Sequence, residues 1–130
     1  MRLLIRGALI LTMKENDEPF SGDILVERDR IAAVVPRWEG RADEVIDASG
    51  MVAMPGLINA HNHTPMTLMR AFCDDLRLMD WLEKKMLPVE ARMNEEDIYW
   101  GAMLAMAEMI RSGTTAYADM YIHMDHVARA

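Results

Sequence analysis

The sequence predicts an α/β fold, namely the start of a (β/α)8 barrel preceded by part of a small β-sandwich domain. Three observations support this. Short apolar segments separated by turn residues fill the amino-terminal part, a continuous apolar stretch follows at 51–60, and an amphipathic helix then leads to another strand at 114–120. Strand, helical excursion and strand in this order are typical of parallel α/β sheets. We place the domain boundary between residues 54 and 55.

Residues 1–54 are expected to contribute short strands to the β-sandwich. The apolar segments are bounded by polar and turn-forming residues, which is the pattern of strands and hairpins. Strands are predicted at 3–11, 23–26, 31–35 and 45–46, with a turn at 27–30 between the second and the third. The run Asp47-Ala48-Ser49-Gly50 predicts a tight turn after the last of them.

Residues 55–130 are expected to form the first βα units of the barrel. The stretch 51–60 is apolar on both alternating faces, which predicts a strand buried inside a parallel sheet. Helical patterns follow at 64–72 and 78–86, and the second is expected to stop near Pro88.

The clearest helix is predicted between Asn94, a good N-cap, and Gly113, a good terminating residue. Its apolar stripe consists of Ile98, Ala102, Ala105, Met106, Met109 and Ile110. A strand at 114–120 and a helix starting at 127 complete the pattern. Such a barrel needs roughly 200–250 residues, and the 130 residues hold about one and a half of its eight βα units. We therefore expect an amino-terminal fragment.

Composition excludes several classes of function. The chain has 14 Lys and Arg against 21 Asp and Glu, and its net charge of −7 argues against nucleic-acid binding. Cys73 is the only cysteine, so neither an internal disulfide nor a paired-cysteine zinc motif can form. The longest uncharged apolar run, 51–58, is too short to cross a membrane. We therefore expect a cytoplasmic protein that binds a small molecule.

The tripeptide His61-Asn62-His63 ends the predicted strand at 51–60. Alternate residues of a strand share a face, so His61 and His63 are expected to point the same way. Two imidazoles in this arrangement can bind one zinc ion, and barrel enzymes have their active sites at the carboxyl ends of the strands. Two polar residues at a strand end would explain the tripeptide equally simply, so both interpretations remain open on these residues alone.

The stretch around this tripeptide resembles the amidohydrolase superfamily, whose first barrel strand ends in such an H-x-H pair. The resemblance rests on residues 45–63, VIDASGMVAMPGLINAHNH. Further segments look like the 5-methylthioadenosine/S-adenosylhomocysteine deaminases: TPMTLMR at 64–70, DWL at 80–82, LPVE at 87–90, SGTT at 112–115 and DMY at 119–121. The resemblance extends over essentially all 130 residues. It departs at Asp29, where relatives commonly have glycine in a hairpin.

The resemblance implies a mononuclear zinc site and hydrolytic deamination of a 5′-thio-substituted adenosine to the inosine product and ammonia. His61 and His63 would be two of the zinc ligands. The remaining ligands and the proton-transferring residues would lie beyond residue 130, so no catalytic residue is assigned within the chain. Glu90 occupies the place of a glutamate that holds the ribose hydroxyls, although a solvated loop carboxylate is the simpler interpretation. A homo-oligomer is possible.

Two alternatives to this function remain. Another amidohydrolase, such as a guanine or cytosine deaminase or a triazine chlorohydrolase, would share the H-x-H pair but would have no ribose for Glu90 to hold. A non-catalytic binding protein could have kept the barrel and lost its chemistry. The remaining polar groups are interpreted as structural or surface residues: His123 and His126, the aspartates 74, 75 and 80, and the thiol of Cys73. The role of Trp81 stays open, since its ring could line the ligand cavity or simply pack.

Overall fold

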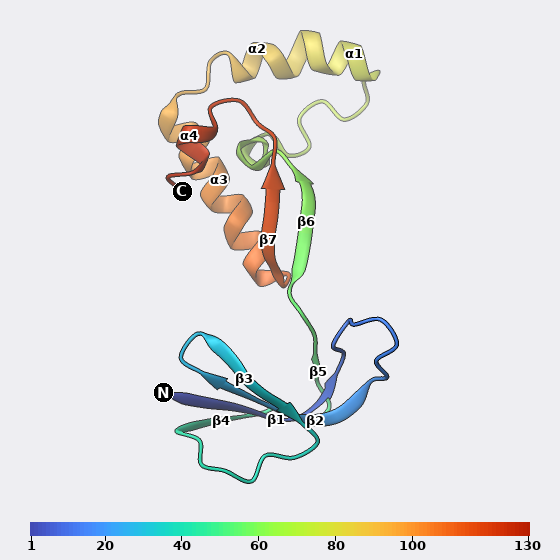
Figure 1. The fold of residues 1–130 in the computed structure, drawn as a ribbon. Helices are drawn as coiled ribbons and strands as arrows, with labels where there is room; N and C mark the ends of the chain where they lie inside the picture. Colours follow the sequence, from blue (N-terminus) through green and yellow to red (C-terminus); the bar gives the residue numbers. More distant parts are fainter. The chain divides into compact units, whose positions relative to one another are not determined.

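The amino-terminal strands form one mixed sheet because their apolar residues alternate and polar segments separate one strand from the next. A computed structural model describes residues 1–130 and divides them into two units, Met1–Pro55 and Gly56–Ala130 (Figure 1). The strands of the first unit are β1 (Arg2–Ile10), β2 (Phe20–Glu27), β3 (Arg30–Val35), β4 (Glu44–Asp47) and β5 (Val52–Ala53). Their order is β3-β2-β1-β4, with β5 also pairing with β1. The first three strands are antiparallel, and β4 and β5 run parallel to β1.

The core of this sheet follows the alternation of β1. Ala8 and Ile10 are buried in one cluster with Ala48, and Ile5 packs against it; Leu4 and its register partner Leu25 are buried outside this cluster. The apolar spacing changes between Ile5 and Ala8 because the β1–β2 register shifts there. Gly7 lies within this irregularity with a φ of 76°, a left-handed conformation that glycine adopts without steric cost.

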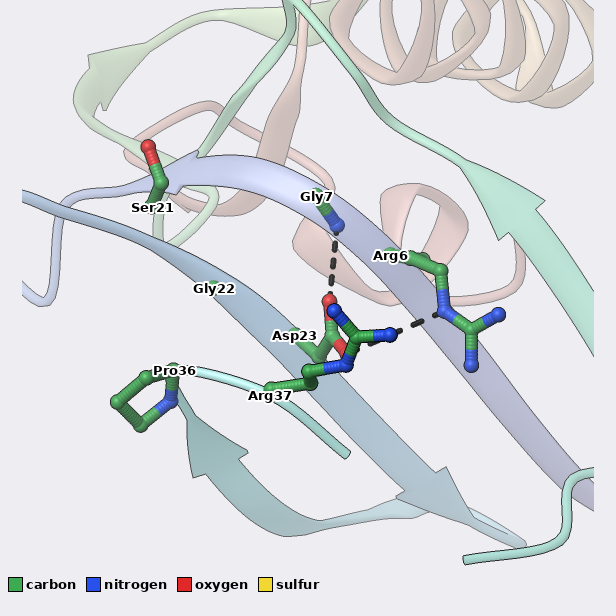
Figure 2. Close-up of a pocket in the computed structure, with 7 residues that line it drawn as sticks. All are labelled: Arg6, Gly7, Ser21, Gly22, Asp23, Pro36 and Arg37. Carbon is green, nitrogen blue, oxygen red and sulfur yellow. Dashed lines mark hydrogen bonds and ion pairs between the residues drawn. The ribbon is translucent and has the colours of Figure 1, made fainter. Parts of the chain in front are cut away.

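A buried carboxylate stabilises the irregularity (Figure 2). Asp23 on β2 is 4% exposed, and its two oxygens accept the N–H groups of Gly7 and Trp38, each at 2.9 Å. The hydrogen bond from Trp38 lowers the pKa of Asp23. Burial opposes this shift, while the Gly7 hydrogen bond and the charges of Arg6 and Arg37 add to it. The carboxylate therefore connects β1, β2 and the segment after β3 in its ionised form.

We expect Asp23→Ala to loosen the sheet at these two amides. Hydrogen exchange at Gly7 and Trp38 should become about ten- to a hundredfold faster, because hydrogen bonds to a charged group contribute about 1.5–3 kcal/mol. Since the folded pKa is lowered, this protection is complete above the ordinary Asp pKa and is lost as the pH falls through the lower folded value. Exchange measured by mass spectrometry tests this. Asp29→Ala is the control, because the Asp29 side chain is 82% exposed. Equal exchange rates at the Gly7 and Trp38 amides in the two variants would contradict the assignment of Asp23 as their acceptor.

The second unit contains two parallel strands joined by a long helical excursion. The strands are β6 (Leu57–Asn62) and β7 (Thr114–Asp119). Between them lie the 3₁₀ helix η1 (Thr64–Met69), α1 (Leu78–Trp81), the π-helical turn η2 (Leu82–Met86), α2 (Leu87–Glu90) and α3 (Glu95–Arg111), and α4 (Met124–Val127) follows β7. In Figure 1, the run α1–η2–α2 extends beyond the carboxyl ends of both strands.

Helix α3 begins and ends where its capping residues predict. The side chain of Asn94 accepts the N–H groups of Glu96 and Asp97, and the Asp97 carboxylate accepts the N–H of Asn94, which completes a capping box. Gly113 follows the C-cap with a φ of 85°. Three residues of the expected stripe are buried, and Met106 packs against them; Ile110 is 75% exposed. The buried residues are Ile98, Ala102 and Ala105.

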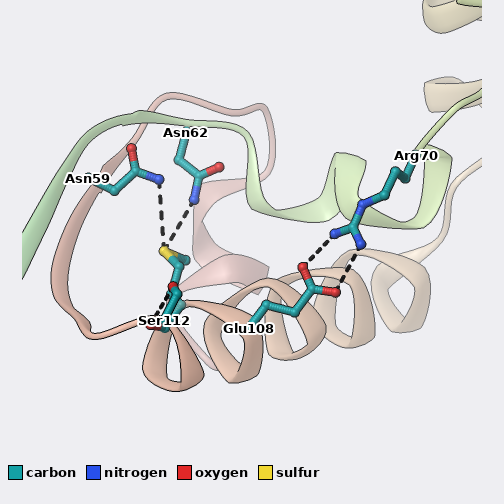
Figure 3. Close-up of polar contacts among 6 residues, drawn as sticks. Asn59, Asn62, Arg70, Glu108 and Ser112 are labelled. Atoms are coloured by element: carbon teal, nitrogen blue, oxygen red, sulfur yellow. Dashed lines mark hydrogen bonds and ion pairs between the residues drawn. The ribbon is translucent and has the colours of Figure 1, made fainter.

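Helix η1 packs closely against the backbone of α3, and an ion pair joins the residue after η1 to α3. Gly101 of α3 is buried, and a Cβ there would lie 2.7 Å from the carbonyl oxygen of Pro65. Arg70 donates two hydrogen bonds to the Glu108 carboxylate, at 3.1 and 2.5 Å (Figure 3). Because η1 starts directly after His63, these contacts also hold the end of β6.

Three predicted elements were wrong in their bounds. The strand expected at 51–60 is two strands, because Pro55 and Gly56 interrupt it and β5 pairs with β1 of the first unit. The faces expected to be buried are open, with Ile58 75% exposed, because β6 pairs with β7 alone. The helical run predicted at 78–86 continues to Glu90, two residues past Pro88, and the π-helical turn Leu82–Met86 lies directly before the proline's segment α2. The last helix starts at Met124 instead of 127.

Candidate metal centre

The two predicted metal ligands lie at the carboxyl end of β6. His61 is exposed and His63 is half-buried. Their ring centres are 5.0 Å apart, and the ring planes are nearly perpendicular, at 83°. Two imidazoles that bind one zinc ion tetrahedrally, with Zn–N bonds of about 2.0–2.1 Å, have ring centres about 5 Å apart. The observed spacing therefore fits a shared ion.

The backbone of the neighbouring strand selects one tautomer of His63. Nδ1 of His63 lies 3.1 Å from the carbonyl oxygen of Met120. A carbonyl only accepts hydrogen bonds, so Nδ1 must be the protonated nitrogen and Nε2 has the free lone pair. A ligating histidine usually donates its other N–H to a carbonyl or carboxylate in this way. The geometry of His63 is thus suited to metal binding through Nε2.

Asp119 holds the chain where it leaves β6. Asp119 ends β7 and pairs in register with Asn62 on β6. Its Oδ2 accepts hydrogen bonds from both the backbone N–H and the hydroxyl of Thr64, a residue that is completely buried. Its Oδ1 is buried and has no hydrogen-bond partner. Because Thr64 follows His63 directly, Asp119 fixes the exit from the strand beside the two histidines.

The amides of β6 also contact α3 (Figure 3). The side-chain nitrogens of Asn59 and Asn62 lie 3.9 and 3.6 Å from Sδ of Met109. Met109 is predicted to belong to the apolar stripe of α3, and its sulfur serves here as a weak acceptor for two half-buried amide groups. This contact orients β6 relative to the helix that precedes β7.

Glu90 lies near the histidine pair through Tyr121. Glu90 ends α2 and is half-buried. Burial is the main cause that raises the pKa of the Tyr121 phenol, and a hydrogen bond with Glu90 and the negative charges of Glu90 and Asp119 add to it. The ring of Tyr121 is centred 6.4 Å from that of His63. Tyr121 therefore lies beside His63 at the carboxyl ends of β6 and β7, and its hydroxyl lies 3.7 Å from Sδ of Met93, in the turn that follows Glu90.

The other polar groups do not join this region. His123 and His126 have ring centres 6.1 Å apart, and Nδ1 of His126 lies 3.7 Å from a carboxylate oxygen of Glu95. Asp80 forms an ion pair with Lys84 one helical turn later, at 2.5 Å. No group of three or more His, Cys, Asp or Glu side chains in the chain is arranged to hold a metal ion, so His61 and His63 form a pair without a third ligand here.

Sequence patterns alone did not assign roles to Asp119 and Tyr121. Both lie more than 50 residues from His63 in the sequence, and only the parallel pairing of β6 and β7 brings them to it. The available signal was topological: residues at the carboxyl end of the next parallel strand lie beside those at the end of the first.

None of the helices in the structure has the length and hydrophobicity required to span a membrane.

Sequence comparisons connect the chain to known proteins. The amidohydrolase family matches residues 52–130. The 5-methylthioadenosine/S-adenosylhomocysteine deaminases of Desulforudis audaxviator and Desulforamulus reducens are 51% and 54% identical to it, over 100% and 99% of the chain. The 5′-deoxyadenosine deaminase of Methanosarcina mazei is 47% identical over 98% of the chain. The chain spans 30–31% of the length of these relatives.

Solved structures support the same relationship. An adenosine deaminase from Xanthomonas campestris with bound zinc matches 98% of the chain with a TM-score of 0.84 and 34% identity, over 30% of its own length. A triazine hydrolase from Arthobacter aurescens matches 98% of the chain with a TM-score of 0.87 and 26% identity, over 32% of its own length. These neighbours are (β/α)8 barrel enzymes, which confirms the predicted fold class. Since the family match covers more than half of the residues, the chain belongs to the amidohydrolase family.

Proposed function

We propose that the protein containing this chain is a zinc-dependent hydrolytic deaminase of adenosines modified at the 5′ position, with 5′-methylthioadenosine and S-adenosylhomocysteine as substrates. The observation that carries the proposal is the pair His61 and His63, whose ring spacing of 5.0 Å suits one zinc ion. The names of the similar deaminases support the substrate class. The same proposal assigns residues 1–54 to a β-sandwich domain and 55–130 to the first βα units of the barrel.

The residues of this chain would hold the metal and keep its ligands oriented. His61 and His63 would bind zinc. The backbone carbonyl of Met120 accepts a hydrogen bond from Nδ1 of His63, and the Asp119 carboxylate accepts one from the N–H of the adjacent Thr64. A bound zinc ion lowers the pKa of water toward neutrality and so supplies the nucleophile for deamination. No residue between 1 and 130 is assigned as the proton-transferring group.

Glu90 would bind the part of the substrate that these compounds share. Methylthioadenosine, S-adenosylhomocysteine and 5′-deoxyadenosine differ at the 5′ position but have the same 2′,3′-diol. A carboxylate can accept hydrogen bonds from both hydroxyls of a diol. Glu90 ends α2, and α2 lies beyond the carboxyl ends of β6 and β7 (Figure 1), the end of the strands at which the histidines lie. A free base or a triazine has no diol, so Glu90 favours a nucleoside over these alternatives.

The proposal is tested in a full-length protein, called here the carrier enzyme. It is the Desulforudis audaxviator relative with its matching segment replaced by residues 1–130 of this chain, at 51% identity between the two. We expect the carrier enzyme to bind about one zinc ion per chain and to convert 5′-methylthioadenosine to the inosine product. A folded carrier enzyme without zinc, or with zinc and no turnover of any 5′-modified adenosine, would contradict the proposal.

Replacing Glu90 should weaken binding of substrates that have the diol. We expect Glu90→Ala to lower kcat/KM for 5′-methylthioadenosine. The loss should correspond to about 1.5–3 kcal/mol of transition-state binding free energy, the range for hydrogen bonds to a charged group. The same variant should lose little activity on the 2′,3′-dideoxy analogue. Glu83→Ala, at an exposed glutamate of η2, is the matched control. Equal losses on the two substrates would show that Glu90 has another role.

A further inference from the structure

A cavity of about 310 Å³ lies in the first unit, beside the irregularity of β1 (Figure 2). Its lining includes Arg6 and Gly7 of β1, Ser21 and Gly22 of β2, and Arg37 in the segment after β3. The glycines contribute backbone alone, so the polar side chains here are two arginines, one serine and the buried Asp23. Hydrogen-bond donors therefore dominate the lining of this cavity.

The two guanidinium groups keep most of these donors free. Arg6 approaches an acidic group only through Nε, which lies 4.0 Å from Oδ2 of Asp23, and its side chain is 52% exposed. Arg37 is exposed and forms no ion pair or side-chain hydrogen bond, and the exposed hydroxyl of Ser21 has no partner either. Each guanidinium has five N–H groups in a planar fork. The cavity therefore offers unused donors from three side chains.

The carboxylate of Asp23 does not use up these donors, because backbone groups already satisfy it. It is 4% exposed, and its two oxygens accept the N–H groups of Gly7 and Trp38, each at 2.9 Å. Its charge offsets that of one arginine, so one positive charge remains in the lining. The chain as a whole has a net charge of −7, which repels anions. An anion bound here would therefore be held by this local arrangement.

We propose that this cavity is a binding site for the phosphate group of a small molecule, held between the guanidinium groups of Arg6 and Arg37 with the Ser21 hydroxyl as a further donor. A guanidinium can donate two parallel hydrogen bonds to phosphate oxygens. A phosphate group has enough oxygens for both arginines and the serine, whereas a carboxylate has two. The inference goes beyond the proposed function, because none of these residues takes part in zinc or nucleoside binding.

The test measures binding of inorganic phosphate to the carrier enzyme by isothermal titration calorimetry. We expect Arg37→Gln to weaken phosphate binding by about tenfold, because it removes hydrogen bonds between charged groups, and to leave the zinc content unchanged. Arg41→Gln is the matched control. Arg41 is an exposed arginine of the same segment after β3 and does not line the cavity, so its substitution should leave phosphate affinity unchanged.

A second variant and a second measurement support the titration. Arg6→Gln should weaken phosphate binding to a similar extent, and a thermal melt without phosphate reports whether this variant folds. Arg37 has no ion pair to lose, so Arg37→Gln decides the test if Arg6→Gln does not fold. Phosphate should raise the Tm of the carrier enzyme, since a ligand that binds only the folded state stabilises it. Arg37→Gln should lose most of this rise.

Four outcomes would overturn the inference. One is the absence of phosphate binding to the folded carrier enzyme. Another is equal phosphate affinity in the carrier enzyme and in Arg37→Gln, because the anion would then be held elsewhere, for example at the zinc ion. Equal weakening by Arg41→Gln would show an effect of net charge in place of a site. Finally, sodium acetate at the same ionic strength should bind more weakly than phosphate, and equal affinity would refute the choice of phosphate over a carboxylate.

Discussion

Replacing either histidine of the pair should remove zinc and activity together. In the carrier enzyme we expect His61→Asn and His63→Asn each to reduce bound zinc to a small fraction of one equivalent. We expect kcat/KM for 5′-methylthioadenosine to fall about a thousandfold or more, because a metal-activated nucleophile contributes several kcal/mol to such reactions. Zinc is measured by elemental analysis after dialysis, and activity by release of ammonia.

His123→Asn is the matched control for this experiment. His123 is exposed, and its φ of 60° is a conformation that asparagine tolerates, so the same substitution should leave zinc and turnover unchanged. Retention of one full zinc equivalent by His61→Asn would refute the assignment of this residue as a ligand. Retention by His63→Asn would refute the assignment of His63 as a ligand through Nε2.

Residues 1–130 expressed by themselves should associate with one another and show no deaminase turnover. β6 and β7 form a sheet of two strands with an unpaired edge on each side, and Ile58 is 75% exposed on it. Open edges and apolar faces favour association. Two histidines without further ligands should hold zinc weakly, because structural and catalytic zinc sites use three or four protein ligands.

Light scattering, a thermal melt and an assay with 5′-methylthioadenosine check this expectation. A monomer that melts cooperatively and turns over substrate would contradict it, together with the proposal that ligands outside this chain complete the site. The carrier enzyme is the reference for full activity. The comparison also separates loss of the site from loss of folding, because the melt reports on folding alone.

Local signals in the sequence predicted the elements whose ends depend on neighbouring residues. Asn94 and Gly113 bound α3 because caps act within one turn of the helix. The strands β1 to β4 follow from alternation and turn chemistry in the same way. The helical run ends two residues later than predicted, at Glu90, because a π-helical turn at Leu82–Met86 changes the backbone hydrogen-bond pattern ahead of Pro88, and such a turn has no signal in the sequence.

Residues that depend on tertiary contacts needed the structure. The H-x-H pair was identified because both ligands lie two residues apart on one strand. The role of Asp119 depends on the pairing of β6 with β7, and the contact of Tyr121 with Met93 depends on the path of the chain after α2. Neither interaction leaves a periodic pattern in the sequence. The exposure of Ile58 likewise depends on which strands are present beside β6, and not on its own neighbours in sequence.

The close packing of Pro65 on Gly101 has a mechanical consequence. It anchors the chain directly after the histidines, and the contact of Tyr121 with Met93 anchors the far end of the excursion. The residues between these two points, 71–89, include α1 and η2. A displacement of this segment is therefore bounded at both ends by contacts with other elements, so that it does not carry the histidines with it.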